Sequence, residues 1–165
     1  MKKINLGLSV LTFLPLLLVG CIHDTEQIEG NAPDFDIVDI DGNRLTLSRF
    51  RGSIVLLDFM ATWCPPCNYE MMELSKLKDE MGDDIVIISI DVDTSENSND
   101  IRNQFGDYVN KWIFALDTDN VASKYGVSAI PKLVLIDENG NIFHTFVGYT
   151  QYEELISKID EMGVE

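Results

Sequence analysis

The sequence predicts an α/β domain with a mixed central sheet, helices on both faces and an N-terminal β-hairpin. Continuous apolar runs at 53–59 and 84–92 are typical of strands buried on both faces. Helix-like segments alternate with such runs, which implies parallel strands joined by crossover helices. Turn signals at 41–43 and 138–141 predict antiparallel hairpins near the two ends of the domain.

Three strands and a long helix are expected in the first half. Residues 35–40 alternate loosely, and 44–47 return after the turn. A buried strand over 53–59 then leads into a helix over 65–81, which Gly82 ends. Four apolar residues of this helix fall on one stripe: Met71, Leu74, Leu77 and Met81.

Strands and helices alternate through the second half. The expected elements are a strand at 84–92, a helix at 98–108, a strand at 112–116, a helix at 121–125, strands at 132–136 and 142–147, and a helix at 151–162. Thr150 is expected to cap the last helix, with Glu153 completing a capping box.

Composition and charge exclude some classes of partner. The 165 residues include 28 acidic and 12 basic side chains, a net charge of -16. Such a surface argues against nucleic acid and against electrostatic docking on anionic lipid. The acidic stretch 91–100 lacks the glycine and the final glutamate of a calcium loop, so it predicts a solvated loop.

Residues 1–20 are typical of an export signal, with Lys2 and Lys3 ahead of an apolar run. The stretch 18–21, Leu-Val-Gly-Cys, resembles the lipobox of exported lipoproteins, and this resemblance implies that Cys21 carries a lipid. Residues 21–31 would then be a tether and 32–165 the folded domain. The alternative is an uncleaved signal anchor. Either arrangement predicts an extracytoplasmic protein held at the cell membrane.

The motif Trp63-Cys64-Pro65-Pro66-Cys67 lies where the buried strand passes into the first helix. A helix N-terminus favours a thiolate on Cys64, and Cys67 lies one turn away, close enough for a disulfide. The pair predicts redox chemistry with no cofactor other than this disulfide. No metal site is expected, because two cysteines need further ligands.

Pro65 and Pro66 limit how far hydrogen bonds can stabilise the Cys64 thiolate. Neither residue has a backbone N–H, so only Cys67 and later residues can donate to the Cys64 sulfur. The thiolate is therefore expected to be stabilised only moderately, which favours a reductant over a strong oxidant.

Four stretches resemble the TlpA/ResA-like branch of exported thiol–disulfide oxidoreductases, which have the thioredoxin fold. They are 32–35 with 41–42 and 47–52, the active-site stretch 59–67, the segment 125–131, and 136–140 with 147–148. The resemblance runs from about Ala32 to Ile159. It implies a thioredoxin-like three-layer sandwich.

The resemblance also implies roles for individual residues. Cys64 would attack a disulfide of the partner, and Cys67 would resolve the mixed disulfide. Asp58 lies six residues before Cys64 inside an apolar strand and matches the buried acid of thioredoxins. A desolvated carboxyl there has a raised pKa and can relay the proton of Cys67. Many thioredoxins have a lysine in the next strand, whereas no lysine lies near Ser89.

Three residues are expected to bind substrate. The bond between Ile130 and Pro131 matches the cis-proline of the family, beside which an extended substrate pairs with the backbone. Trp63 is expected to form an apolar rim, with a half-buried core position as the alternative.

These features predict a reductase of disulfides in exported proteins. Its partners would be disulfide-containing exported proteins, with apocytochrome c as one candidate, and a membrane dithiol that donates electrons. One alternative is a peroxiredoxin-like thiol peroxidase, although Thr62 lies two residues before Cys64 where peroxiredoxins have three. The other is a non-catalytic lipoprotein that binds clients.

Overall fold

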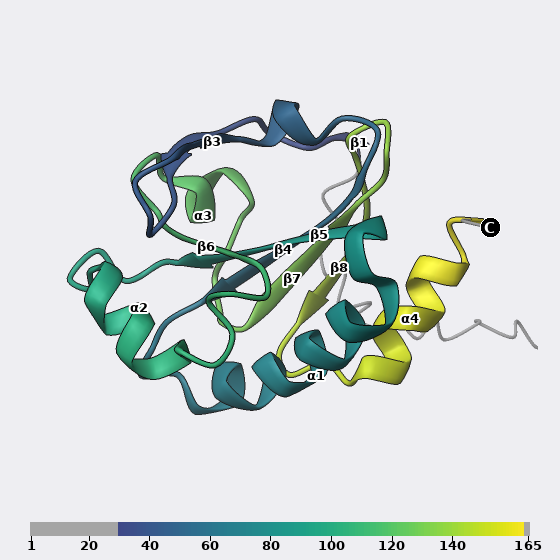
Figure 1. Ribbon diagram of the computed structural model, residues 1–165. Helices are drawn as coiled ribbons and strands as arrows, with labels where there is room; N and C mark the ends of the chain where they lie inside the picture. Colours follow the sequence, from purple (N-terminus) through teal and green to yellow (C-terminus); the bar gives the residue numbers. More distant parts are fainter. Residues whose placement is uncertain (1–29, 164–165) are drawn as a thin grey trace, which may run out of the picture.

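The computed structural model describes residues 30–163, which form an α/β domain of the predicted architecture (Figure 1). The strands are β1 (Gly30–Asn31), β2 (Asp36–Val38), β3 (Arg44–Thr46), β4 (Ile54–Met60), β5 (Ile85–Asp91), β6 (Ile113–Leu116), β7 (Lys132–Ile136) and β8 (Asn141–Val147). The α-helices are α1 (Pro65–Met81), α2 (Ser98–Phe105), α3 (Val121–Lys124) and α4 (Tyr152–Asp160). No helix within this range is both long and apolar enough to cross a membrane.

The central sheet has the strand order β1-β8-β7-β4-β5-β6. Strands β4, β5 and β6 are parallel, and β7, β8 and β1 continue the sheet in antiparallel pairs. The hairpin β2-β3 forms a separate two-stranded sheet, as its turn signal predicts. The alternation of strands and helices and the two hairpins were thus correctly predicted from the sequence.

Each face of the sheet has its own core. Figure 1 shows α1 and α4 beneath the sheet, and α3 with the N-terminal hairpin above it. Residues of β4 alternate between the two cores, with Leu56 facing α1 and Leu57 facing α3. All seven residues of β4 are buried, which explains its continuous apolar run.

The long helix forms where the sequence predicts it. Met71, Leu74 and Leu77 are buried on its inner stripe. The helix ends at Gly82, whose φ of 56° is a conformation that glycine adopts readily, and the Gly82 N–H donates to the Lys78 carbonyl. The second helix, α2, begins at a capping box of Asn97 and Asp100 and is shorter than expected, since it ends at Phe105.

The first strand begins earlier than the expected domain start at Ala32. Gly30 and Asn31, which the sequence analysis places in the tether, pair with Ile142 and Asn141 of β8. Backbone pairing with an exposed sheet edge needs no apolar side chain, so the polar sequence gives no signal for it. The predicted signal, the Cys21 lipidation site and most of the tether lie outside the described residues.

The predicted cap of the last helix is wrong. Helix α4 has Gln151 at its N-cap, and no side chain of its own caps it. Carboxyl groups of α1 accept backbone N–H groups here instead: Tyr152, the first helical residue, donates to Glu73 (3.1 Å), and Thr150, just before the N-cap, donates to Glu70 (2.9 Å). Acceptors from α1 thus take the place of a local capping box.

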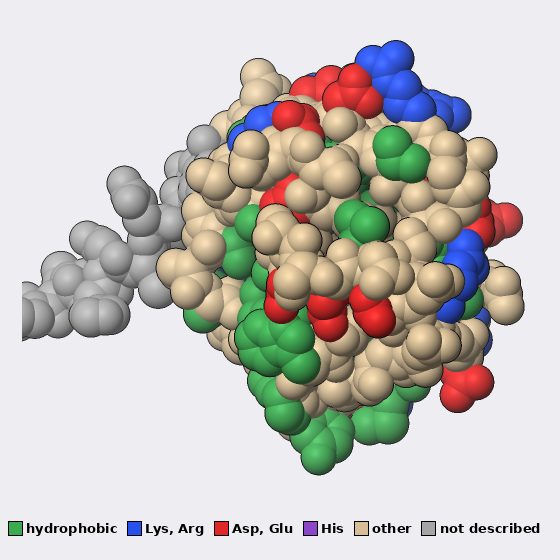
Figure 2. Space-filling model, turned by 90° about the vertical axis from the view of Figure 1, so that its left-hand side faces the viewer, with side chains coloured by type: hydrophobic (Ala, Val, Ile, Leu, Met, Phe, Trp, Pro, Cys, Tyr) green, Lys and Arg blue, Asp and Glu red, His purple; other side chains and the backbone are tan. Residues whose placement is uncertain are grey.

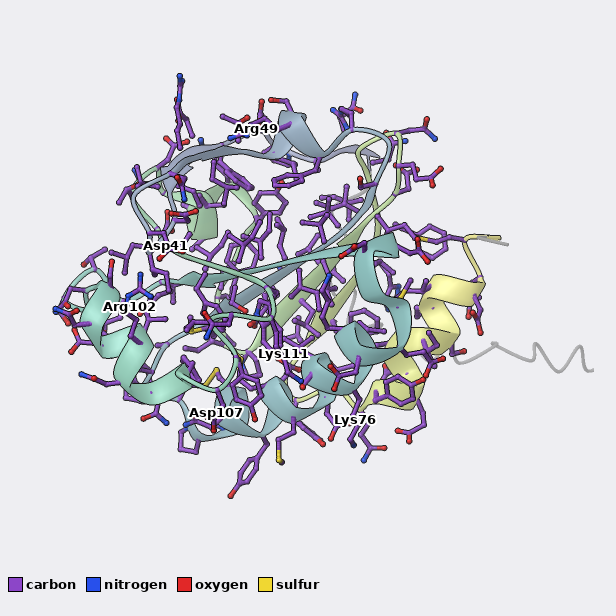
Figure 3. The ribbon with its side chains drawn as sticks, in the orientation of Figure 1. Asp41, Arg49, Lys76, Arg102, Asp107 and Lys111 are labelled. Carbon is purple, nitrogen blue, oxygen red and sulfur yellow. A yellow bond between two sulfur atoms is a disulfide. The ribbon has the colours of Figure 1, made fainter. Side chains whose placement is uncertain are left out.

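The hairpin is fastened to the main sheet at its turn. The Ile40 N–H donates to the Phe114 carbonyl of β6 (2.9 Å). Arg102 on α2 reaches the turn and contacts the Asp41 carboxylate (2.5 Å) and the Ile40 carbonyl (2.9 Å); Figure 3 shows Arg102 and Asp41 in this region. These contacts fix the hairpin beside the sheet edge.

Candidate active site

The two cysteines lie at the start of α1, directly after β4 and a short loop. Cys64 is the N-cap residue, and it is joined to Cys67 in a disulfide. Cys64 is 2% exposed and Cys67 is fully buried. Only Cys64 therefore offers any surface to a partner, which fits the expected order of attack.

The paired prolines have the predicted effect on the hydrogen bonds of Cys64. Pro65 and Pro66 occupy the first two helical positions. The Cys64 sulfur accepts one backbone bond, from the Cys67 N–H at 3.3 Å. A helix start without prolines can offer more than one such donor.

Asp58 lies on the face of β4 that packs against α1, and it is fully buried. Its Oδ2 accepts a hydrogen bond from the Ser89 hydroxyl at 2.6 Å, whereas Oδ1 has no partner among the described residues. Burial raises the pKa of Asp58 to about 7, against the opposing effect of the Ser89 hydrogen bond. The predicted direction of this pKa shift is confirmed, while the proton-relay role stays a prediction.

Glu70 is a second buried acid, which the sequence analysis missed. It lies one turn after Cys67 on the inner side of α1 and is completely buried. Its Oε1 accepts the Thr150 N–H, and within residues 30–163 its Oε2 has no partner. Burial, and next the negative charge of Asp58, raise the pKa of Glu70 to about 9.

A signal for Glu70 was present in the helical periodicity. Residues three apart on a helix share a face, so Glu70 follows Cys67 on the stripe that also contains Leu74 and Leu77. A glutamate on a buried stripe needs a reason, just as Asp58 does within its apolar strand. Two protonatable carboxyls therefore lie on the dithiol side of the sheet.

The peptide bond between Ile130 and Pro131 is cis, as predicted. Strand β7 begins directly afterwards, and its Lys132 pairs with Phe59 near the end of β4. Pro131 therefore lies at the same end of the sheet as the C-terminal end of β4, from which the chain continues to Cys64. The Pro131 carbonyl accepts the Gly148 N–H (2.8 Å), so the end of β8 also lies there.

Trp63 lies on the surface next to Cys64, with 62% of the residue exposed. The alternative of a half-buried core residue is thereby wrong. Its indole N–H donates to the Asp93 carboxylate at 2.7 Å. The ring is thus held at the rim of the site by a hydrogen bond.

The acidic loop after β5 is more than the solvated loop that the sequence predicts. The Glu96 carboxylate accepts the backbone N–H of Thr62 (3.0 Å) and also binds the Thr62 hydroxyl. Asp91 is buried and accepts the Asp93 N–H (2.9 Å). Burial, and then the neighbouring Glu96 carboxyl, raise the pKa of Asp91 to about 8. We call residues 91–96 the acidic clasp, because they hold the loop that precedes Cys64.

An apolar surface adjoins the dithiol. Figure 2 shows hydrophobic side chains gathered at the lower part of one face, where Figure 1 places the start of α1, with acidic side chains beside them. Trp63, Tyr69 and Met72 are large exposed apolar residues of this part of the chain. Val147, the last residue of β8, and Tyr149, two residues later, add exposed apolar surface. This surface suits an extended polypeptide better than a small polar molecule.

Comparison with known proteins agrees with this geometry. The Redoxin family model matches residues 28–162. Thioredoxin-like protein YneN of Bacillus subtilis is 32% identical over 130 residues, covering 78% of this chain and 76% of YneN. The thiol-disulfide oxidoreductase ResA of Bacillus thuringiensis (strain Al Hakam) is 31% identical over 166 residues, covering 94% of this chain and 95% of ResA.

A solved structure extends the similarity to the fold. The crystal structure of the exposed lipoprotein thioredoxin Etrx1 from Streptococcus pneumoniae superposes with a TM-score of 0.66 at 26% identity. The match covers 78% of this chain and 99% of that one. The fold is therefore thioredoxin-like, as predicted. The chain belongs to the Redoxin family, and it is a ResA-like thiol–disulfide oxidoreductase with Cys64 and Cys67 as its active-site pair.

Proposed function

We propose that this protein is an extracytoplasmic, membrane-tethered reductase of disulfides in exported proteins. The observation that carries the reducing direction is the single backbone N–H that reaches the Cys64 sulfur. A thiolate with few donors is a poorer leaving group, and this favours the oxidised form of the pair and so the donation of electrons. The export signal and Cys21 in the sequence support the tether, as does similarity to a protein described as an exposed lipoprotein.

The reaction begins with the reduced pair. The Cys64 thiolate attacks one sulfur of the substrate disulfide, which forms a mixed disulfide and releases the other substrate sulfur as a thiolate. Cys67 then gives its proton to the Asp58 carboxylate and attacks the Cys64 sulfur. The second substrate thiolate leaves, and the Cys64–Cys67 disulfide remains, so two electrons have passed to the substrate.

The site residues divide this work. Asp58 accepts the Cys67 proton, and the substrate backbone lies beside Ile130 and Pro131 with Trp63 at the rim. A membrane dithiol returns two electrons to the pair for the next cycle. Exported proteins with disulfides are the substrates, and apocytochrome c is one candidate among them.

Trapping tests the activity and identifies the substrate. In a Cys67→Ser variant the mixed disulfide on Cys64 cannot be resolved, so the substrate should accumulate as a covalent adduct. A Cys64→Ser variant is the matched control and should capture nothing. Adducts equally abundant in both variants, or absent from the first, would contradict the reductase proposal.

The reducing direction has its own measurement. The reduction potential of the purified domain, equilibrated with glutathione or dithiothreitol, should lie near that of thioredoxin, about −270 mV. A potential near −120 mV, typical of a strong oxidant, would overturn the direction but not the chemistry.

The tether can be tested separately. A lipoprotein should incorporate labelled palmitate in the wild type and lose the label in a Cys21→Ser variant. Membrane association of a wild-type protein that takes up no label would mean that it is held by an uncleaved anchor.

The peroxidase alternative has less support from the geometry. Thr62 binds Glu96 through both its N–H and its hydroxyl, so this threonine has no free donor for a peroxide. Rapid consumption of hydrogen peroxide by the reduced protein would favour that alternative. Full function in a Cys64→Ser, Cys67→Ser double variant would favour the non-catalytic one.

A further inference from the structure

A chain of three buried side chains lies on the dithiol side of the sheet. The Trp112 indole N–H donates to the Ser89 hydroxyl oxygen at 3.0 Å, and the Ser89 hydroxyl donates to Asp58 Oδ2 at 2.6 Å. Asp58 and Ser89 are direct neighbours on β4 and β5. Asp58 and Ser89 are fully buried, and Trp112 is nearly so.

The direction of this chain is fixed by chemistry. An indole N–H can donate but cannot accept, so Trp112 occupies a lone pair of the Ser89 oxygen. Ser89 has one hydroxyl hydrogen, and that hydrogen points to Asp58 Oδ2. The ionised Asp58 therefore receives a hydrogen bond at Oδ2, and Oδ1 remains the open position for a proton.

The first donor is itself held in place. Trp112 stacks between the rings of Tyr108 and Phe114, with centroid distances of 5.4 and 5.5 Å. Aromatic pairs at such distances are favourable. The indole N–H consequently keeps its direction when the charge on Asp58 changes.

Among residues 30–163, no buried lysine or arginine lies on this face of the sheet. The residues of β5 that face α1 are Ile85, Ile87, Ser89 and Asp91. The titratable groups on this side of the sheet are Glu70, whose pKa the charge of Asp58 raises, and Asp91 at the end of β5, with Cys64 and Cys67 once their disulfide is reduced. All of these are acids or thiols, so the Ser89 hydroxyl is the group that stabilises an ionised Asp58.

We propose that Ser89 and Trp112 are positioning residues that hold Asp58 ready to take the Cys67 proton on Oδ1. The inference rests on the proposed role of Asp58 in the resolving step. The chain keeps Oδ2 engaged, and it lets the carboxylate exist at neutral pH in a fully buried place.

The pH dependence of the resolving step tests this. Mixed disulfide is formed on Cys64 with a small aromatic disulfide, and its resolution by Cys67 is followed by stopped flow across pH. Ser89→Ala removes the hydrogen bond to the carboxylate and should move the midpoint of the profile up by about one pH unit. Below the midpoint the rate should fall about tenfold.

Two further variants keep the test decisive. Trp112→Phe preserves the aromatic stack but removes the N–H, and it should move the midpoint upward by a smaller amount. Ser157→Ala, at an exposed position of α4, is the matched control and should leave the profile unchanged. Wild-type profiles in both Ser89→Ala and Trp112→Phe would overturn the inference.

The Asp58→Asn variant separates the two proposals. If Asp58→Asn slows resolution and Ser89→Ala adds nothing in that background, both proposals are supported. If Asp58→Asn slows resolution but Ser89→Ala acts equally with or without Asp58, the positioning role fails and the relay stands. If Asp58→Asn leaves resolution unchanged, the relay fails, and the positioning role fails with it.

Discussion

The two faces of the central sheet treat buried polar groups differently. On the face covered by α3, Lys132 is buried, and its ammonium donates to the carbonyls of Tyr125 (2.7 Å) and Gly126 (3.1 Å). On the α1 face, Asp58, Glu70 and Asp91 each have one oxygen without a partner. These three are the unpaired buried side-chain atoms of residues 30–163.

The difference separates buried groups that stabilise the fold from buried groups that can exchange a proton. A buried group whose hydrogen bonds are satisfied holds the chain in place, as Lys132 holds the loop that leads to the cis-proline. A buried carboxyl with an open oxygen costs stability when it is charged, but it has a free position for a proton. The α1 face, which contains the dithiol, has the second kind of group.

The largest expected effect is a loss of stability with rising pH, caused by the buried carboxyls of the α1 face. The folded-state pKa values of Asp58 and Glu70, about 7 and about 9, lie above the ordinary values of 3.8 and 4.5. Their contribution to stability is therefore complete below the ordinary values and is lost as pH rises through the folded-state values. The Asp58 shift alone corresponds to about 4 kcal/mol of unfolding free energy lost by the oxidised protein between pH 4 and pH 7, and Glu70 extends the loss toward pH 9.

Denaturant unfolding of the oxidised protein at several pH values measures this loss. In an Asp58→Asn, Glu70→Gln double variant the loss should become much smaller, with Asp91 accounting for a remainder. Asp107→Asn is the matched control, because Asp107 is an exposed acid after α2, labelled in Figure 3. An unchanged pH dependence in the double variant would show that these carboxyls are not desolvated.

The second prediction tests the α3 face, where the hydrogen bonds of buried Lys132 are satisfied. Lys132→Met retains a long apolar side chain but leaves the carbonyls of Tyr125 and Gly126 unpaired, so the unfolding free energy should fall by about 2 kcal/mol. The oxidised and reduced forms should lose stability equally, since Lys132 lies on the face opposite the dithiol. The reduction potential should then stay at its wild-type value. A changed potential would mean that Lys132 acts on the chemistry as well as on the fold.

The third prediction concerns the acidic clasp. Glu96→Gln weakens the two hydrogen bonds that Thr62 donates, a loss of about 1 kcal/mol local to the loop before Cys64. Amide hydrogen exchange at Thr62 should become several-fold faster, while exchange in β4 stays slow. Asp107→Asn again serves as control. Equal exchange rates at Thr62 in the wild type and the Glu96→Gln variant would show that the acidic clasp does not hold the loop before Cys64.

The smallest effect is expected at the rim. Trp63→Phe keeps an apolar ring but loses the indole N–H that binds Asp93, and because the residue is exposed its stability should change by less than about 0.5 kcal/mol. If Trp63 contacts substrate, KM should rise a few-fold with kcat unchanged. A fall in kcat alone would place Trp63 in the chemical step.

Local sequence signals predicted the parts of the site that local structure determines. The helix start at Cys64 and the effect of the two prolines depend on adjacent residues and were predicted correctly. The cis bond before Pro131 was correctly implied by the family resemblance. Burial of Asp58 followed from its apolar strand. The fold followed from the alternation of buried strands with helices and from the two hairpin turns.

Contacts between distant segments could not be predicted in the same way. Glu70 accepts a hydrogen bond from Thr150, 80 residues away, and this replaces the expected local cap of α4. Glu96 binds Thr62 across 34 residues, so a loop that looked merely solvated is part of the site. The acceptor that a polar group finds depends on strand register and helix packing, and neither can be predicted from local patterns in a single sequence.

The pairing of β1 with β8 places the start of the domain and the dithiol at opposite ends of one strand. Gly30 and Asn31 join the beginning of β8, whereas the end of β8 lies beside Pro131 at the edge of the dithiol. Six residues of strand, about 20 Å, separate the two. A surface or fusion partner joined directly before Gly30 therefore meets the domain far from the sulfur atoms. A version of residues 30–165 immobilised at Gly30 should keep its dithiol open to large substrates.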